Sequence, residues 1–590
     1  MNFAGDLFRS GRLVAFVALS LIGLLPDRVI AQMDMSGHAM GVRNETPPAD
    51  LPVPQKIAGV GNSHMRITAK PEAQIWFDQG LNLLHDFWDY ESARAFEQSI
   101  RVDPQCAICY WGLYHAEAFY HGLAQGYAEP ALATAVKLKG RAGKRERLLI
   151  EATAAIEEAN ESEKPGPRRA KAMQLWRKLA KEFPADIQIR LFLAQRVDQK
   201  EKLAILEAIL KEDPNNSAAN HYYIHALEGG QHPEQALHSA EVLAGLAPAS
   251  GHMVHMPGHI FSRLGDYARA EQAFAASVQV DENYMRDQHV QPDNDWNYVH
   301  NLMYAVANLM EEGKLSQATA LSAKLTGARG ELGSTLYTYS TRDSISRLAP
   351  TLPVALRTAD WAQVVDRLKT IPPPVDLPNL EFLARQIGIF AAGMQAVDTH
   401  DLKLAEQSSA KFDAELWRIS HQSKVTDDEP LPPPEQPADP PQLTVMPDAE
   451  LQPLLSALSI MSLELQASLL AAQGENTDAH SLFTRAANAE KALGYREPPS
   501  YIRPVGETEA AAMMAAGAWA DARTAYEQAL LQRPRSGFAL YGIALSSENE
   551  GNASGAAKEY EDFLSVWNNA DASLPQVMHA KAWLAAHSAS

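Results

Sequence analysis

The chain has 590 residues, of which 46% are hydrophobic, so it is long enough for several domains or one long repeat array with an ordinary core. Acidic residues outnumber basic ones by 72 to 52, and the resulting net charge of −20 argues against nucleic acid as the main partner, because phosphate binding needs clustered lysine and arginine. Only two cysteines are present, which excludes a disulfide-rich scaffold.

Residues 1–31 have the features of a secretory signal peptide. Arg9 and Arg12 precede an apolar run from Leu13 to Leu25, which is too short for a comfortable membrane span. We therefore expect an exported protein, periplasmic or secreted, without a stable membrane span after cleavage. The alternative is an uncleaved N-terminal anchor.

Residues 32–69 contain methionine, histidine and several prolines, and we expect them to form a disordered leader. Thioether sulfur suits Cu(I), so the methionine-rich residues 33–40 are also a candidate for binding that ion. The plain alternative is a leader that binds nothing.

Helical patterning dominates from about residue 70 to the end, with many alanines, leucines and glutamates and few alternating β-branched runs. A period of 34 residues recurs, for example between Pro214 and Pro248 and between Tyr526 and Tyr560. A single helix pair cannot bury its apolar stripe alone, so neighbouring pairs stack into a superhelix with a concave face. The sequence therefore predicts an all-α solenoid of stacked helix pairs.

One segment interrupts the repeats. Residues 426–449 are acidic and carry eight prolines between positions 430 and 447, a composition typical of a linker or long loop. This linker divides the array into an N-terminal solenoid, residues 70–425, and a C-terminal helical block, residues 450–590.

Histidines are concentrated in one part of the N-terminal solenoid: nine of the 19 lie between residues 221 and 300. In the segment 221–228, helical periodicity places His221, His225 and Glu228 on one face. In the segment 251–259, His252, His255 and His259 also share a stripe if the segment is helical. Pro257 is expected to kink or restart that helix, which leaves the direction of His255 open.

The two histidine segments are related by the repeat. His221 and His255 are 34 residues apart, as are His225 and His259, so they occupy equivalent positions in adjacent units. Stacking brings equivalent positions side by side.

Clustered neutral imidazoles are the commonest metal ligands in proteins. We predict a transition-metal site, with copper or zinc preferred and iron next, formed by His221, His225, His255 and His259. Glu228, His252 and His300 are predicted as additional ligands or as groups that orient the ligands. The alternatives are ordinary buried histidines and a groove that binds a carboxylate ligand.

Further candidates lie in the first two units. Cys106 and Cys109 form a CxxC pair, which is compatible with a disulfide, a redox pair, two soft metal ligands or an inert structural role. His85 and His115 are placed where they can reach the groove. The sequence has no HExxH, GxSxG, Walker A or GxGxxG motif, which argues against several common enzyme classes.

Several longer motifs give the chain a family resemblance. They are the Tyr-Tyr-Ile-His-Ala-Leu-Glu run at 222–228, the His-Met-Pro-Gly-His-Ile-Phe run at 255–261, the His-Asn pair at 300–301 and the Glu-Pro-Pro run at 497–499. With them the chain resembles a family of bacterial, often exported, tetratricopeptide-repeat proteins. The resemblance implies a tetratricopeptide-type solenoid with a histidine-rich groove, which Glu497 and Tyr501 close from the C-terminal block. It implies no particular reaction.

Two functional hypotheses follow. The first is an exported metalloprotein; if it is an enzyme, metal-dependent oxidation is slightly preferred to hydrolysis. The second is a scaffold that binds a peptide or protein partner in the concave groove without metal, which is the usual role of such repeats.

Overall fold

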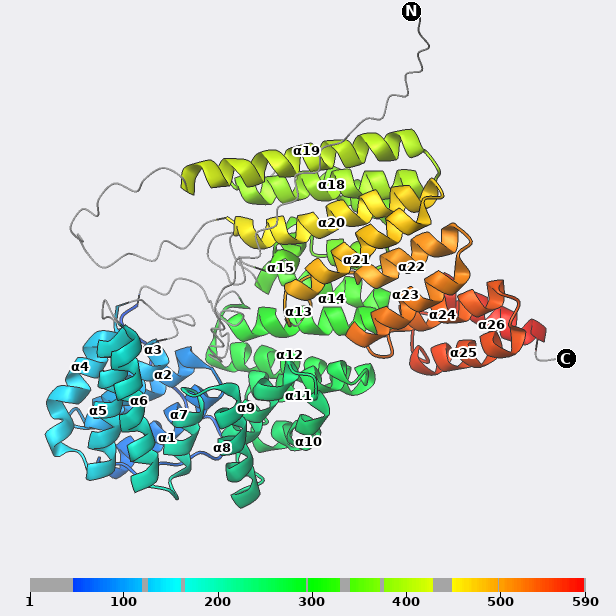
Figure 1. The fold of residues 1–590 in the computed structure, drawn as a ribbon. Helices are drawn as coiled ribbons and strands as arrows, with labels where there is room; N and C mark the ends of the chain where they lie inside the picture. Colours follow the sequence, from blue (N-terminus) through cyan, green and yellow to red (C-terminus); the bar gives the residue numbers. More distant parts are fainter. Residues whose placement is uncertain are drawn as a thin grey trace, which may run out of the picture.

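The computed structural model describes residues 46–118, 126–160, 165–292, 295–328, 340–371, 376–427, 448–496 and 498–587. Within these ranges the regular structure is helical, with no β-strand, and successive helices stack along the chain (Figure 1). The predicted all-α solenoid of helix pairs is confirmed. The predicted signal peptide, the methionine-rich residues 33–40 and residues 428–447 of the linker lie outside the described residues.

The helices before the linker are α1 (Pro71–His85), α2 (Asp89–Val102), α3 (Ala107–Glu117), α4 (Ala128–Leu138), α5 (Lys144–Asn160), α6 (Pro165–Glu182), α7 (Ile187–Ala194), α8 (Gln199–Glu212), α9 (Ser217–Glu228), α10 (Leu237–Leu246), α11 (Gly251–Arg263), α12 (Tyr267–Gln288), α13 (Trp296–Glu311), α14 (Leu315–Ala328), α15 (Thr341–Leu348), α16 (Leu352–Arg357), α17 (Trp361–Thr370), α18 (Pro378–Asp398) and α19 (Leu402–Asp427). After it come α20 (Leu451–Ala472), α21 (Asn476–Ala492), α22 (Val505–Ala515), α23 (Trp519–Gln532), α24 (Gly537–Asn549), α25 (Ala553–Val566) and α26 (Pro575–His587). Short 3-10 turns occupy Pro48–Asp50, Lys139–Arg141 and Pro233–Ala236.

The contacts between helices show how the helix pairs stack. Apart from α14 and α15, each helix packs on the next described helix in the chain, and the first helices of consecutive pairs also touch, as α9 with α11, α11 with α13, and α22 with α24. The turns within the α11–α12 and α13–α14 pairs place Gly265 and Gly313 at φ of 72° and 70°, a left-handed conformation that glycine adopts without steric cost. These contacts set α9, α11 and α13 side by side.

The C-terminal block folds back onto the middle of the solenoid. The indole N–H of Trp567 donates to the main-chain oxygen of Glu311 over 2.8 Å, and the hydroxyl of Tyr267 donates to the main-chain oxygen of Pro534 over 2.9 Å. The blocks on either side of the linker therefore pack against each other, although the linker separates them in sequence (Figure 1).

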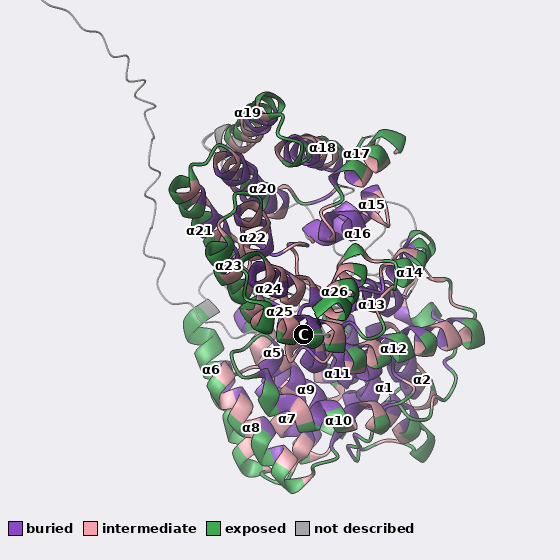
Figure 2. Cartoon of the chain, turned by 90° about the vertical axis from the view of Figure 1, so that its right-hand side faces the viewer, coloured by how far each residue is buried: buried purple, intermediate pink, exposed green. Residues whose placement is uncertain are grey.

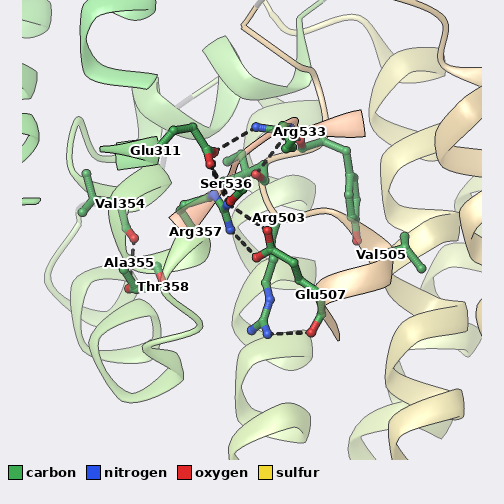
Figure 3. Close-up of polar contacts among 12 residues, drawn as sticks. Glu311, Val354, Ala355, Arg357, Thr358, Arg503, Val505, Glu507, Arg533 and Ser536 are labelled. Atoms are coloured by element: carbon green, nitrogen blue, oxygen red, sulfur yellow. Dashed lines mark hydrogen bonds and ion pairs between the residues drawn. The ribbon is translucent and has the colours of Figure 1, made fainter. Parts of the chain in front are cut away.

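A buried ion cluster joins the two blocks (Figure 3). Arg357, at the end of α16, donates to both carboxylate oxygens of Glu311 from α13, over 2.8 and 2.9 Å. Arg357 also donates to both carboxylate oxygens of Glu507 from α22, over 2.5 and 2.9 Å. Arg533 also pairs with Glu311, at 3.1 Å. Such bidentate pairs fix the relative positions of the helices that carry them.

Helix α20 is the one helix in the described residues that is long and apolar enough to cross a membrane by length and composition, with a mean hydropathy of 1.6 in its most apolar stretch. In this structure 61% of that stretch is buried, and α20 packs on α18, α19, α21 and α22. Figure 2 shows it buried on the side that faces the other helices. Core helices of soluble proteins can have the same length and composition, so these two properties are weak evidence for a membrane span.

The expected disordered leader is wrong for residues 46–69, which pack on the first helices. Leu51 and Met65 are buried in the N-terminal core. The amide of Asn82 donates to the main-chain oxygen of Ser63 over 2.8 Å, and the main-chain N–H of Ile57 donates to Gln79 over 3.0 Å. The leader sequence is polar, but its few apolar side chains and its main chain find partners on α1.

The expected break at Pro257 is absent, because α11 runs without interruption from Gly251 to Arg263. The helix tolerates the missing N–H of Pro257, and His252, His255 and His259 all belong to one regular helix.

Close packing between neighbouring helices gives a first testable prediction. A Cβ at Gly112 in α3 would lie 2.3 Å from Cε1 of the fully buried Phe96. Gly112→Ala is therefore expected to cost about 1–3 kcal/mol of stability, which thermal unfolding followed by circular dichroism detects as a lower Tm.

The matched control is Gly245→Ala in α10, where an added Cβ meets nothing within 4 Å. Because alanine favours helix over glycine, this variant should melt at or above the wild-type temperature. Equal melting temperatures for the two variants would contradict the packing of α3 on Phe96.

Candidate metal centre

Six histidines lie close together where the first helices of three successive helix pairs, α9, α11 and α13, lie side by side. α9 carries His221 and His225, α11 carries His252, His255 and His259, and α13 carries His300. Their side chains are almost completely buried, with at most 5% exposure. The structure divides them into two groups, the first trio (His221, His225, His252) and the second trio (His255, His259, His300), in each of which one nitrogen per ring lies within 4.8 Å of the others.

The first trio has the spacing of metal ligands. Nε2 of His252 lies 3.1 Å from Nε2 of His221 and 3.4 Å from Nε2 of His225. Nitrogens bound at about 2.0–2.1 Å to a tetrahedral ion stand about 3.3 Å apart. These two Nε2–Nε2 separations are thus already near those that one ion requires.

The second trio is tighter. Nε2 of His255 and Nε2 of His259 are 2.6 Å apart, so a tetrahedral ion would have to separate them by roughly 0.7 Å. The ring of His300 lies 4.7 Å from that of His255, centroid to centroid. The two trios are neighbours, since the His225 and His259 rings are 6.4 Å apart and the His252 and His255 rings 5.9 Å apart.

Glu228 connects the two trios. Its Oε1 accepts from Nδ1 of His225 over 2.9 Å, and its Oε2 lies 2.7 Å from Nδ1 of His259. A carboxylate only accepts hydrogen bonds, so each of these Nδ1 atoms is the one that carries a proton toward Glu228, and Nε2 is the nitrogen of each ring that is left to bind a metal. Carboxylates that orient metal-binding histidines in this way are a common feature of metal sites.

Burial sets the charge of the groups in this centre. It lowers the pKa of His221 and of His252 well below the usual range, so both rings are neutral at pH 7. Burial alone would raise the pKa of Glu228, but His225 and His259 on either side hold that pKa below its ordinary value. The neutral rings of His221 and His252, beside an ionised carboxylate, are a donor set suited to a divalent cation.

Main-chain and aromatic groups complete the first trio. Nδ1 of His221 donates to the main-chain oxygen of His85 over 2.7 Å, which again leaves its Nε2 for a ligand. The Phe87 ring lies 4.7 Å from the His221 ring and 5.4 Å from the His225 ring. Phe87 has φ of 59° in the turn between α1 and α2, although glycine occupies the left-handed position in the α11–α12 turn. This strained conformation costs about 1–2 kcal/mol and places an apolar ring on the trio.

The predicted set of four histidines therefore does not form one site. His221 and His225 belong to the first trio with His252, whereas His255 and His259 belong to the second with His300. Each carboxylate oxygen of Glu228 lies beside a histidine Nδ1 atom, one of His225 and one of His259. Glu228 is therefore placed to orient ligands rather than to bind an ion itself.

The structure does not bring the histidines of the first units into either trio. Both ring nitrogens of His85 are engaged, at 2.7 Å from the Tyr222 hydroxyl and 2.7 Å from Oε1 of Gln188. His115 packs in the N-terminal core, 4.5 Å from the Trp111 ring.

Cys106 and Cys109 form a disulfide at the start of α3, and Sγ of Cys109 lies 3.1 Å from the Ser99 hydroxyl. In this state neither sulfur is a thiolate ligand.

The two residues expected to close the groove are only partly described. Glu497 lies outside the described residues. Tyr501 is buried and its hydroxyl donates to Glu464, so that burial and the carboxylate raise the pKa of Tyr501. Tyr501 lines a cavity that Tyr304 also lines, and the Tyr304 ring lies 4.5 Å from the ring of His255. The C-terminal block thus reaches the space beside the second trio.

Two aromatic contacts of the centre were not identified from the sequence. Tyr304 follows His300 by four residues on α13, a spacing that puts both on one face of the helix. Phe87 stands at a turn position that several other helix pairs, such as α11–α12 and α13–α14, fill with glycine, and a bulky residue there is a signal of local constraint.

No family model matches the sequence, and no curated protein matches it. Among solved structures, the chain is similar to the human IFIT1 dimer with m7Gppp-AAAA, at 13% identity over 85% of this chain and 96% of that one, with a TM-score of 0.31. It is also similar to yeast Tom70, at 11% identity over 88% and 96% of the two chains, with a TM-score of 0.30. The P58(IPK) TPR domain matches at 13% identity over 70% of this chain and 98% of that one, with a TM-score of 0.18. Similarity at this level says nothing about what the chain binds.

Proposed function

We propose that the protein binds two transition-metal ions, one at each histidine trio, with copper or zinc preferred and iron next. The observation that carries the proposal is the presence of two groups of three buried imidazoles, linked by one carboxylate, Glu228, which contacts one ring of each group. Three neutral imidazoles leave a coordination position open for substrate or water, which is typical of catalytic rather than structural sites.

An ion at such a site supplies a Lewis acid or, if it is copper or iron, a redox centre. Of the two reaction types, oxidation is preferred to hydrolysis. Metal-assisted hydrolysis gains from a general base beside the ion. Glu228 is the carboxylate that contacts the two trios in the described residues, and each of its oxygens already lies beside a histidine Nδ1 atom, so it is poorly placed to act as that base. The second trio is surrounded instead by the rings of Phe274 and Tyr304.

We further propose that the protein acts outside the cytoplasm. The signal-peptide pattern of residues 1–31 supports export. The disulfide between Cys106 and Cys109 also suits an oxidising compartment, where such bonds persist.

A peptide-binding scaffold is less well supported at this face of the solenoid. The histidines expected to line an open groove are buried, under Phe87 on one side and beside Tyr304 on the other. A peptide would have to displace these rings before it reached the imidazoles.

Glu228→Gln tests the proposal. The amide offers one acceptor oxygen in place of two, so it cannot accept from both Nδ1 atoms, and loss of such an orienting partner typically costs 10- to 100-fold in metal affinity. We expect a loss of that size for Zn²⁺ in a competition titration against a chromogenic chelator.

Glu234→Gln is the matched control, because Glu234 also pairs with a histidine, His232, but both side chains are exposed. It should bind Zn²⁺ like the wild type. If Glu228→Gln does the same, Glu228 does not position metal ligands.

A further inference from the structure

A cavity of about 390 Å³ lies between the histidine-bearing helices and the C-terminal block. It is lined by Ser262 and Arg263 of α11, by Asn308 of α13, by the connection after α21 that includes Tyr495, and by Arg533 beyond α23. Pockets for small molecules have volumes of this order and often lie between structural units. The metal proposal does not account for this space.

A layer of aromatic side chains separates the cavity from the second trio. Phe274 and Tyr304 line it. The Tyr304 ring also lies 4.5 Å from His255, 4.8 Å from His259 and 4.6 Å from His300, measured between ring centroids. A molecule in the cavity therefore lies beside the second trio.

The walls of the cavity favour a planar ring. Five aromatic side chains line it: Tyr267, Phe274, Tyr304, Tyr495 and Tyr501. Aromatic rings pack on one another in stacked or edge-to-face geometry with a gain of about 0.5–1.5 kcal/mol per pair beyond simple burial. An aliphatic chain of the same size would not obtain these contacts.

The charged groups of the lining favour an anion. Of the charged lining residues that the structure describes, four are cationic, namely Arg263, Lys491, Arg496 and Arg533, and two are acidic, Glu311 and Glu490. Arg533 and Glu311 pair with each other. Among these described residues the remaining charge is positive, in a chain whose net charge is −20.

Arg263 is held in place by the protein rather than by a carboxylate. It donates to the main-chain oxygens of Glu228 and Gly230 over 3.0 and 2.9 Å, and its guanidinium lies 5.3 Å from the centre of the Tyr495 ring. An arginine stacked on a tyrosine at the wall of an aromatic pocket is well placed to meet a carboxylate.

We propose that this cavity binds a small aromatic carboxylic acid, with its ring among the tyrosines and its carboxylate on the cationic side of the wall. The role of this acid as a substrate rests on the proposed metal centre, because the second trio is the reactive group that the cavity adjoins. Binding itself rests only on the cavity.

Isothermal titration calorimetry with three probes tests the proposal. 4-Hydroxybenzoate should bind the full chain with a Kd below about 1 mM. Cyclohexanecarboxylate, which lacks the aromatic ring, and benzylamine, which has the opposite charge, should bind at least tenfold more weakly. Equal binding of all three, or no binding of 4-hydroxybenzoate at millimolar concentration, would overturn the proposal.

Two variants locate the site. Lys491→Gln with Arg496→Gln removes two cationic side chains of the lining and should weaken 4-hydroxybenzoate binding about tenfold or more. Arg485→Gln, at an exposed position of α21 outside the lining, is the control for charge alone and should bind like the wild type. Equal affinity in the double variant and this control would place any binding elsewhere.

Metal content measured on the same samples separates this proposal from the metal proposal. A protein that holds two ions but fails to bind the acid contradicts only the assignment of the cavity. A protein that binds the acid but takes up no metal contradicts only the metal centre.

Discussion

Alanine at both His255 and His259 is expected to reduce the bound metal from two equivalents to one. These substitutions remove two of the three nitrogens of the second trio and leave His221, His225 and His252 intact. One remaining imidazole cannot hold an ion against buffer, whereas the first trio keeps all its ligands. Elemental analysis after Zn²⁺ loading and gel filtration gives the stoichiometry directly.

Folding and surface histidines are controlled separately. The variant should retain the circular dichroism of the wild type, because a loss of helix would remove metal for a trivial reason. His232→Ala with His238→Ala deletes two histidines outside both trios and should leave two equivalents bound. If the double variant at 255 and 259 also keeps two, the second trio is not a metal site.

Arg357→Met is expected to destabilise the protein by about 3–5 kcal/mol, the largest effect on stability that the structure suggests. Arg357 is fully buried between Glu311 and Glu507, with four hydrogen bonds to their carboxylates. Removing one partner of a buried ion cluster leaves uncompensated charge in the interior. Unfolding in urea, followed by circular dichroism, measures the loss.

A partly exposed pair provides the comparison for Arg357. Arg523 pairs with Glu559 at 2.7 Å, but their side chains are 32% and 21% exposed. Solvent screens such pairs, so Arg523→Met should cost less than about 1 kcal/mol. A loss at Arg357 no larger than the loss at Arg523 would show that the buried cluster does not hold the two blocks together.

Acid should weaken the same cluster. Burial alone would raise the pKa of Glu311, but Arg357 outweighs it and lowers this pKa to about 2 from an ordinary value of 4.5. A carboxyl group whose pKa is lower in the folded state stabilises the fold above pH 4.5, and this contribution is lost as the pH falls toward 2.

Much of the architecture was predictable because equivalent residues of successive helix pairs recur at a fixed spacing in the sequence. The 34-residue interval between His221 and His255, and the glycines at 265 and 313, reflect helix pairs that stack in register. The packing of residues 46–69 on α1 was not predictable, because it depends on single side chains such as Leu51 and Met65 and on main-chain hydrogen bonds without a periodic pattern. The return of the C-terminal block onto α13 is likewise a long-range contact.

The members of the candidate site were predictable, but their grouping was not. Helical spacing and the repeat register identified all six histidines and Glu228. Which rings converge depends on side-chain directions on three different helices, and His252 turns toward α9 although His255 and His259 on the same helix pair with His300. The disulfide between Cys106 and Cys109 was one of several open alternatives, since a CxxC spacing fits each of them.

The central claim is that two buried histidine trios bind two metal ions. Elemental analysis of untagged protein, residues 32–590, purified without chelator, tests it most directly, since a His-tag would add ligands of its own. The structure predicts about two equivalents of copper, zinc or iron, retained through gel filtration. A protein that is isolated without metal and takes up none on titration with Cu²⁺, Zn²⁺ and Fe²⁺ would contradict the claim.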